Sequence, residues 1–447
     1  MELCGRRFDT GEPVGLDIVN GRISQVTPCT IDAQQAQEWP WIAPGFLDIQ
    51  VNGYGGQEFS SPELTPEKVL EPVRSFDAFG VVRCCPTVTT ESLDVLEHAL
   101  RTIVAACESS PEVARRVVGV HLEGPFITRE DGPRGAHPLQ HCREPDWDAF
   151  QRLQEAAQGR IRIHTMSPEF DGSSAFVRQV AESGVVVAIG HTAAQPSQIR
   201  RAVDAGARLS THLGNGSHAQ VHRHRNYIWA QLAEDRLTAS MIVDGHHLPP
   251  DVVKTFVRTK TAERCILVSD ISGQAGQPPG RYRSDFCDVE ILPEGRLVVA
   301  GQRELLAGAA LPIGPAIPNV MHFAGIGLTD AVRMAVHNPA ELLGIDPGGL
   351  EPGSRADLVQ FRLAEPPNGD APARFELGAT VIHGEVVWGA LWQPHPRQPS
   401  PRTDSRSTQV SPPTRVDRPT RGASPKTGRQ KPLSRGVTGQ CRPPQAG

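Results

Sequence analysis

The sequence predicts an α/β fold: a (β/α)8 TIM-like barrel with a small β-sandwich domain built from both ends of the chain. Two observations predict it. Strand-like apolar runs alternate with helix-like stretches through the middle of the 447 residues, and β-hairpin signals lie near both ends. Eight strands that alternate with helices match such a barrel in number and size.

The alternating middle of the chain contains eight apolar runs with strand character. They are 46–51, 81–84, 117–122, 161–165, 185–189, 209–212, 238–243 and 265–269. Helix-like stretches lie between most of them, over 95–108, 147–158, 176–183, 196–205 and 250–259. A doubly wound sheet would show the same alternation, but reactive residues at the ends of four separate strands favour the barrel.

Both ends of the chain carry hairpin signals. Near the N-terminus, two apolar segments within 16–26 flank Asn20-Gly21, a pair that favours a type I′ turn. Near the other end, two apolar segments within 380–388 flank His383-Gly384-Glu385. The two β-rich ends are therefore expected to join in one small domain.

The composition divides the chain into four parts. We expect residues 1–43 and 346–393 to build the β domain and residues 44–345 to build the barrel. Residues 394–447 are rich in Pro, Arg and Ser and poor in large apolar residues, so they predict a disordered basic tail. A nucleic-acid tether is the alternative for this tail. A solvated extension is favoured because no aromatic residues interleave its charges.

The remaining composition excludes several classes of protein. No stretch approaches the roughly 20 apolar residues of a membrane helix, and residues 1–10 lack the apolar segment of a secretory signal. The nine cysteines are scattered without CxxC spacing, which favours the reducing cytoplasm over a disulfide scaffold or structural zinc. No GxGxxG or P-loop follows an early strand, which argues against nucleotide binding.

Four residues with metal-binding or acid–base chemistry end predicted strands. They are Glu123, His191, His212 and Asp270. Singly, each has an ordinary explanation: a loop carboxylate, a hydrogen-bonded histidine or a turn cap. Together they meet at the mouth of one barrel, where a carboxylate and two imidazoles suit one divalent ion such as Zn²⁺ or Fe²⁺. Beside that ion, Asp270 could take a proton from water and later donate it to a leaving amine.

Further motifs follow one another along the chain. They are PGFLDIQVNG at 44–53, HLEGPF at 121–126, GAHP at 135–138, GHTA at 190–193, THL at 211–213, DGHH at 244–247, SD at 269–270, NPA at 338–340 and GSRADLV at 353–359. In this order they resemble the N-acetylglucosamine-6-phosphate deacetylases of the amidohydrolase superfamily. The resemblance ends near Trp388. It implies a barrel of the amidohydrolase type, a homodimer, and hydrolysis of the sugar's acetamide to acetate and glucosamine 6-phosphate in amino-sugar catabolism.

The first-strand motif bears on the number of metals. Many amidohydrolases carry His-x-His there and bind two metal ions, whereas this chain carries Gln50 and Asn52. Amides are poor ligands beside imidazole. We therefore expect one catalytic ion, held by Glu123, His191 and His212.

The resemblance also implies the substrate contacts. Ala136, His137 and His247 match sugar-binding positions. The positions that hold the 6-phosphate match Asn215, Gly216 and Arg223. The lining of the sugar pocket matches Leu306, Ala307 and Gly308.

Loop 214–229 and Ala309 depart from the family pattern. Both lie where substrate is held, so two alternatives stay open. One is an amidohydrolase that acts on another N-acyl substrate, such as a different acetamido sugar or an acylated amino acid. The other is a non-catalytic paralogue that binds sugar phosphates.

Overall fold

The computed structural model describes residues 1–30, 32, 38–283, 287–366 and 369–392. The chain divides into two units, Met1–His395 and Pro396–Gly447. The predicted tail at 394–447 lies outside the described residues, so its disorder stays a prediction.

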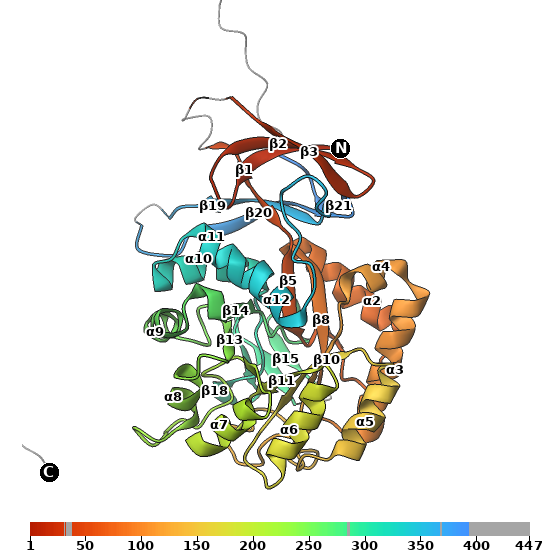
Figure 1. Ribbon diagram of the computed structural model, residues 1–447, viewed down its shortest axis with the longest axis vertical. Helices are drawn as coiled ribbons and strands as arrows, with labels where there is room; N and C mark the ends of the chain where they lie inside the picture. The colour runs from red at the N-terminus through yellow and green to blue at the C-terminus, as the bar shows by residue number, and fades with distance from the viewer. Residues whose placement is uncertain (31, 33–37, 284–286, 367–368, 393–447) are drawn as a thin grey trace, which may run out of the picture. The chain divides into compact units, whose positions relative to one another are not determined.

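Eight parallel strands form the barrel sheet, with hydrogen-bonded neighbours in the order β14-β13-β12-β11-β10-β9-β8-β5 (Figure 1). They are β5 (Phe46–Val51), β8 (Val81–Thr89), β9 (Val120–Glu123), β10 (Ile161–Met166), β11 (Val186–Ile189), β12 (Leu209–Ser210), β13 (Thr238–Ile242) and β14 (Cys265–Val268). Each predicted strand run overlaps one of them, and their order in space follows the chain, as in a TIM barrel. The predicted fold class is confirmed.

The first and last barrel strands meet just beyond their carboxyl ends. The backbone N–H of Asp270 donates to the carbonyl oxygen of Gln50, and the N–H of Asn52 donates to that of Ile271, both at 2.9 Å. Below them, both carboxylate oxygens of Asp48 accept from the backbone N–H of Ser269 at 3.2 Å. These bonds close the barrel and place Gln50 and Asn52 beside Asp270.

Asp48 makes this junction sensitive to pH. Its side chain is buried, which raises its pKa to about 7, although hydrogen bonds from Ser269 and Gln50 lower it. The unfolded carboxyl titrates near pH 4, so the folded state binds more protons between about pH 4 and 7 and the free energy of unfolding falls as pH rises through that window. Asp48→Asn removes this dependence.

The wild type should therefore gain thermal stability relative to Asp48→Asn when the pH is lowered from 7.5 to 5. Differential scanning fluorimetry measures this difference in Tm. The exposed Asp17→Asn serves as the control that should show no such trend. A Tm difference between wild type and Asp48→Asn that is equal at both pH values would refute the role of Asp48.

Helices cover the outside of the barrel (Figure 1). They are α2 (Pro66–Ser75), α3 (Leu93–Ser109), α4 (Pro111–Arg116), α5 (Trp147–Ala156), α6 (Ser173–Glu182), α7 (Pro196–Asp204), α8 (Tyr227–Leu232), α9 (Pro250–Lys260), α10 (Ile313–Ala324), α11 (Leu328–Val332) and α12 (Asn338–Leu343). The five predicted helices correspond to α3, α5, α6, α7 and α9. Within the described ranges, no helix combines the length and apolar character needed to cross a bilayer.

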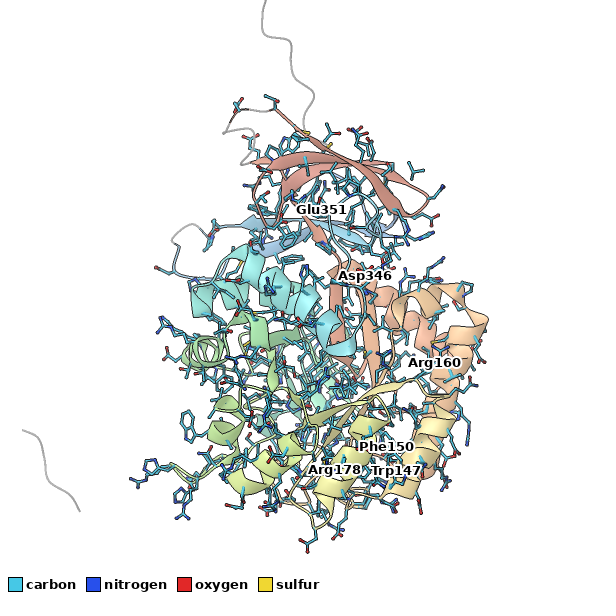
Figure 2. All side chains as sticks on the ribbon, in the orientation of Figure 1. Trp147, Phe150, Arg160, Arg178, Asp346 and Glu351 are labelled. Carbon is cyan, nitrogen blue, oxygen red and sulfur yellow. The ribbon has the colours of Figure 1, made fainter. Side chains whose placement is uncertain are left out.

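The sequence explains how these helices begin and which side they bury. The hydroxyl of Ser92 caps α3 by accepting from the backbone N–H of Val95. On α5, the rings of Trp147 and Phe150 stack with centroids 5.7 Å apart (Figure 2). Phe150 is buried there against the ring of His164 from β10. Apolar residues at helical spacing thus bind the helical layer to the barrel.

Both ends of the chain join in a seven-stranded sheet, in the order β21-β20-β19-β4-β1-β2-β3. Its strands are β1 (Glu2–Arg7), β2 (Pro13–Val19), β3 (Arg22–Pro28), β4 (Trp41–Pro44), β19 (Leu358–Ala364), β20 (Arg374–Ile382) and β21 (Glu385–Gly389). Asn20-Gly21 and His383-Gly384 form the two hairpin turns, and all four residues have positive φ, as a type I′ turn requires. Both predicted hairpins are confirmed; the predicted domain boundaries stay predictions.

A small antiparallel sheet between β14 and α10 was not predicted. It consists of β15 (Gly280–Tyr282), β16 (Val289–Ile291), β17 (Leu297–Val299) and β18 (Gln302–Leu306), and we call it the inserted sheet. It has an apolar cluster of its own, formed by Val289, Ile291, Leu297 and Ala307. Strands as short as three residues show too little alternation to be recognised in a sequence.

Candidate active site

The four residues singled out in the sequence lie at the carboxyl ends of barrel strands. Glu123 ends β9, and His191, His212 and Asp270 each lie two residues past the end of β11, β12 and β14. Those three have φ values of 46°, 29° and 50°. Non-glycine residues adopt this left-handed region uncommonly, and such strain clusters at functional sites. The turn in the backbone aims each side chain into the mouth of the barrel.

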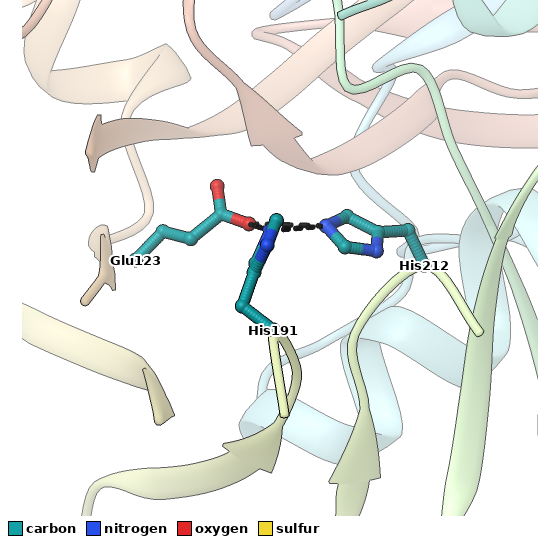
Figure 3. A group of neighbouring side chains, drawn as sticks. All are labelled: Glu123, His191 and His212. Carbon is teal, nitrogen blue, oxygen red and sulfur yellow. Dashed lines mark hydrogen bonds and ion pairs between the residues drawn. The ribbon is translucent and has the colours of Figure 1, made fainter. Parts of the chain in front are cut away.

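Glu123, His191 and His212 converge on one point (Figure 3). The Nε2 atoms of both histidines lie 3.1 Å from Oε1 of Glu123 and 3.1 Å from each other. All three side chains are buried. We call them the metal triad, and the structure brings them together as the sequence predicted.

The geometry of the metal triad fits a divalent cation. Ligands held about 2.1 Å from a tetrahedral ion lie roughly 3.4 Å from one another, close to the spacing of these three atoms. Nδ1 of His191 lies 3.0 Å from the carbonyl oxygen of Pro133, so a proton on Nδ1 donates there and leaves the Nε2 lone pair for a metal. Two imidazole nitrogens and one carboxylate oxygen are a donor set suited to Zn²⁺ or Fe²⁺.

The amides of the first barrel strand support the two site carboxylates. Nε2 of Gln50 donates to Oε1 of Glu123 at 3.1 Å, and Nδ2 of Asn52 donates to Oδ1 of Asp270 at 2.8 Å. Burial raises the pKa of Glu123, but the adjoining imidazoles of His191 and His212 outweigh burial and hold it well below its usual value. Gln50 and Asn52 thus position ionised oxygens.

Asp270 has the properties of a proton acceptor. It lies beside the metal triad, in the lining of the same cavity. Burial and the neighbouring charge of Glu123 raise its pKa to about 6, although the hydrogen bond from Asn52 lowers it. A carboxyl with this pKa is mostly ionised at neutral pH, yet it accepts a proton more readily than an ordinary aspartate does.

These groups open on a cavity of about 380 Å³. Eight of the nine predicted substrate contacts line it; they are Ala136, His137, Asn215, Gly216, His247, Leu306, Ala307 and Gly308. Nε2 of His137 lies 3.2 Å from Nε2 of His191, next to the metal triad. Arg223 is the exception, because it is exposed and does not line the cavity in the described structure.

Asp244 holds His247 in place. One carboxylate oxygen lies 2.8 Å from Nδ1 of His247, and the other accepts from the backbone N–H groups of His246 and His247 at 2.8 and 2.9 Å. Burial raises the pKa of Asp244, but the hydrogen bond and charge of His247 lower it to about 2. Asp244 is therefore ionised at every pH at which the protein would be assayed.

Asp244→Asn should raise KM for the substrate by about 10- to 100-fold, because a hydrogen bond to a charged group contributes roughly 1.5–3 kcal/mol. The change in kcat should be smaller, since Asp244 acts through His247. Steady-state kinetics of the wild type and the variant measure both constants. The exposed Asp251→Asn is the matched control. An unchanged KM would show that His247 needs no such partner.

Comparison with known protein families agrees with this geometry. The model of the amidohydrolase family matches residues 41–387, most of the chain. The chain belongs to the amidohydrolase family. Amidohydrolases are metal-dependent hydrolases, and the metal triad is the candidate metal site of this member.

Named relatives and solved structures are similar over nearly their whole length. An N-acetylgalactosamine-6-phosphate deacetylase of Escherichia coli O157:H7 is 30% identical over 348 residues, which cover 77% of this chain and 89% of the relative. An N-acetylglucosamine-6-phosphate deacetylase of Bos taurus is 32% identical over 358 residues, covering 78% and 83%. The crystal structure of N-acetyl-D-glucosamine-6-phosphate deacetylase from Mycobacterium smegmatis has a TM-score of 0.75 at 30% identity, covering 87% of this chain and 100% of that one.

Several residues that line the cavity of this amidohydrolase were not predicted. They include Glu58 after β5, His246 after β13, and Arg296 and Leu305 of the inserted sheet. His246 adjoins a predicted residue and could have been found from the DGHH motif. Arg296 had no such signal, because the inserted sheet around it was not recognised.

Proposed function

We propose that this chain deacetylates N-acetylglucosamine 6-phosphate, with glucosamine 6-phosphate and acetate as products, in amino-sugar catabolism. One observation carries the proposal: the metal triad and Asp270 open on the same cavity as eight of the nine predicted substrate contacts. The names of relatives about 30% identical support it. A cavity of about 380 Å³ is in the range that takes a small ligand.

We assign one divalent ion, Zn²⁺ or Fe²⁺, to Glu123, His191 and His212. Such an ion supplies Lewis-acid polarisation of a carbonyl group and lowers the pKa of water. Asp270 accepts a proton from the water as it attacks the acetamide carbon, and it donates that proton to the nitrogen of the departing amine. Asn52 fixes Asp270 through Oδ1, which leaves Oδ2 for the proton. His137 and His247 hold the sugar in the cavity.

A second candidate substrate is N-acetylgalactosamine 6-phosphate, because the Escherichia coli relative carries that name. The two sugars differ only in the configuration at C4, so the metal triad and Asp270 would act on either. A substrate without the phosphate, or an acylated amino acid, is the more distant alternative that loop 214–229 leaves open.

Acetate release and metal content, measured on the purified full chain, test the proposal. The assay compares both phosphorylated sugars, their unphosphorylated forms and an N-acetyl amino acid. We expect about one ion per chain and the highest kcat/KM with N-acetylglucosamine 6-phosphate. Preference for the galactose epimer would establish the second candidate. Acetate release from none of them by the metal-loaded chain would indicate the non-catalytic paralogue.

We further propose a cytoplasmic setting and a homodimer for this enzyme. The described cysteines are free thiols, which suits a reducing compartment. The homodimer is implied by family resemblance, and light scattering of the full chain would measure it.

A further inference from the structure

We propose that the carboxylate of Glu169 is a positioning group that holds His191 in the conformation in which it binds the metal ion. This inference rests on the ion assigned to the metal triad under the proposed function, and it does not depend on which sugar is the substrate. Glu169 lies between β10 and α6, whereas His191 lies past the end of β11. Within the described structure Glu169 is not among the residues that line the cavity, so it acts on the site through other residues.

The backbone of His191 needs support from its surroundings. Its φ of 46° lies in the left-handed region, which a residue with a side chain keeps only where neighbouring contacts fix it. Nε2 of His191 lies 3.1 Å from both Oε1 of Glu123 and Nε2 of His212 (Figure 3). A small rotation of this backbone would move Nε2 away from the other two ligand atoms. Metal affinity therefore depends on the contacts that hold the segment around His191.

The carboxylate of Glu169 restrains His191 from two sides. Oε2 of Glu169 accepts from the backbone N–H of Ala193, and Oε1 accepts from the hydroxyl of Thr128, both at 2.7 Å. Thr128 in turn donates its backbone N–H to the carbonyl oxygen of His191 at 3.0 Å. One carboxylate thus holds both the segment that follows His191 and the residue that binds the His191 carbonyl group.

A hydroxyl extends this contact to the residue next to His191. Oγ of Ser167 lies 2.8 Å from both Oε2 of Glu169 and Oγ1 of Thr192. Thr128, Ser167 and Thr192 are all buried. Hydrogen bonds between buried groups meet little competition from water, so they hold their geometry well.

The groups around the carboxylate come from three neighbouring loops of the barrel. Thr128 follows β9, Ser167 follows β10 and Ala193 follows β11. Two of these strands lead into metal ligands, because Glu123 ends β9 and the loop after β11 carries His191. Glu169 therefore ties the loop after one ligand to the loop that contains another.

The chemistry of this contact separates two substitutions of Glu169. A carboxylate has only acceptor atoms, and it meets the N–H of Ala193 and the hydroxyl of Thr128 as donors. Glutamine can keep both contacts, since its amide oxygen can accept from Ala193 while its NH2 group donates to the hydroxyl of Thr128. Alanine can make neither contact.

The test compares Glu169→Ala with Glu169→Gln and with a control, Gln198→Ala. Nε2 of Gln198 donates to the backbone carbonyl oxygen of Glu169 at 2.6 Å, and Oε1 accepts from the backbone N–H of Gln195 at 2.7 Å. Gln198→Ala therefore loosens the same region but keeps the carboxylate. The full chain is stripped of metal and titrated with Co²⁺, whose visible absorption reports both affinity and ligand geometry.

We expect Glu169→Ala to weaken Co²⁺ binding about 10- to 100-fold and to change the absorption spectrum of the bound ion. Glu169→Gln should recover most of the affinity, and Gln198→Ala should match the wild type. Should Glu169→Ala fail to fold, Thr128→Val, which removes one donor to the carboxylate, should show the same change at smaller size. The Tm of each metal-free variant, measured alongside, shows whether the chain is folded.

Co²⁺ affinity and spectrum unchanged in Glu169→Ala, or in Thr128→Val where that variant takes its place, would overturn the role of Glu169. So would equal weakening in Gln198→Ala, since that would indicate general loosening of the region. Acetate release distinguishes this inference from the proposed function. If no sugar is deacetylated but Glu169→Ala weakens Co²⁺ binding as expected, the proposed function fails and the role of Glu169 stands. If acetate is released but Glu169→Ala binds Co²⁺ as the wild type does, the reverse holds. A wild type that binds no Co²⁺ would overturn both.

Discussion

Asp270→Asn is expected to lower kcat about 1,000-fold while KM and the bound metal change little. General acid–base groups contribute roughly 10²- to 10⁴-fold to a rate, and an amide cannot accept the proton that the carboxylate takes. The fold around the site should persist, because the Asn side-chain oxygen can still accept from Nδ2 of Asn52, as Oδ1 of Asp270 does at 2.8 Å.

Acetate release and metal content of the same preparation measure this prediction. Asp148→Asn, an exposed aspartate in the first turn of α5, is the control for loss of one carboxylate. Turnover of Asp270→Asn within tenfold of the wild type, with the ion still bound, would remove Asp270 from the proton-transfer role.

Removal of the metal should abolish activity and lower thermal stability together. The ligand atoms of Glu123, His191 and His212 are already gathered within 3.1 Å, so an ion would bind the folded state and not the unfolded chain. An ion whose free concentration is 100 times its Kd then adds about 2.7 kcal/mol to the free energy of unfolding. For a folded chain of this size that amounts to roughly 3 °C in Tm.

The experiment removes the ion with a chelator and adds Zn²⁺ or Fe²⁺ back. The wild type should regain both acetate release and Tm. His212→Ala should regain neither, because two ligands bind too weakly at the same concentration. His222→Ala removes an exposed histidine from loop 214–229 and should behave as the wild type does. A chain that is fully active without a bound ion would contradict the assignment of the metal triad.

The parts of the fold that follow from local patterns were predictable. Apolar runs bounded by helical stretches gave every barrel strand, and Asn20-Gly21 with His383-Gly384 located both hairpins. The metal triad and Asp270 were also predictable, because residues at the ends of parallel strands meet at one mouth. Because the carboxyl ends of parallel barrel strands meet at one mouth, side chains far apart in the sequence could be placed together.

The rest depends on contacts that no local pattern records. The bonds from Gln50 to Glu123 and from Asn52 to Asp270 join residues 73 and 218 positions apart. The inserted sheet has strands too short to show a period, so the cavity position of Arg296 was unpredictable. Composition likewise could not show that Arg223 lies outside the cavity.

The inserted sheet has a consequence for how this enzyme evolves. It lies between two elements of the barrel, β14 and α10, and has an apolar cluster of its own. The metal triad and Asp270 reside on the barrel, whereas Arg296 and Leu306 reside on the insertion. Mutation in the insertion can therefore alter the preferred substrate while the inherited reaction is conserved. The two parts of the cavity can diverge at different rates within one lineage.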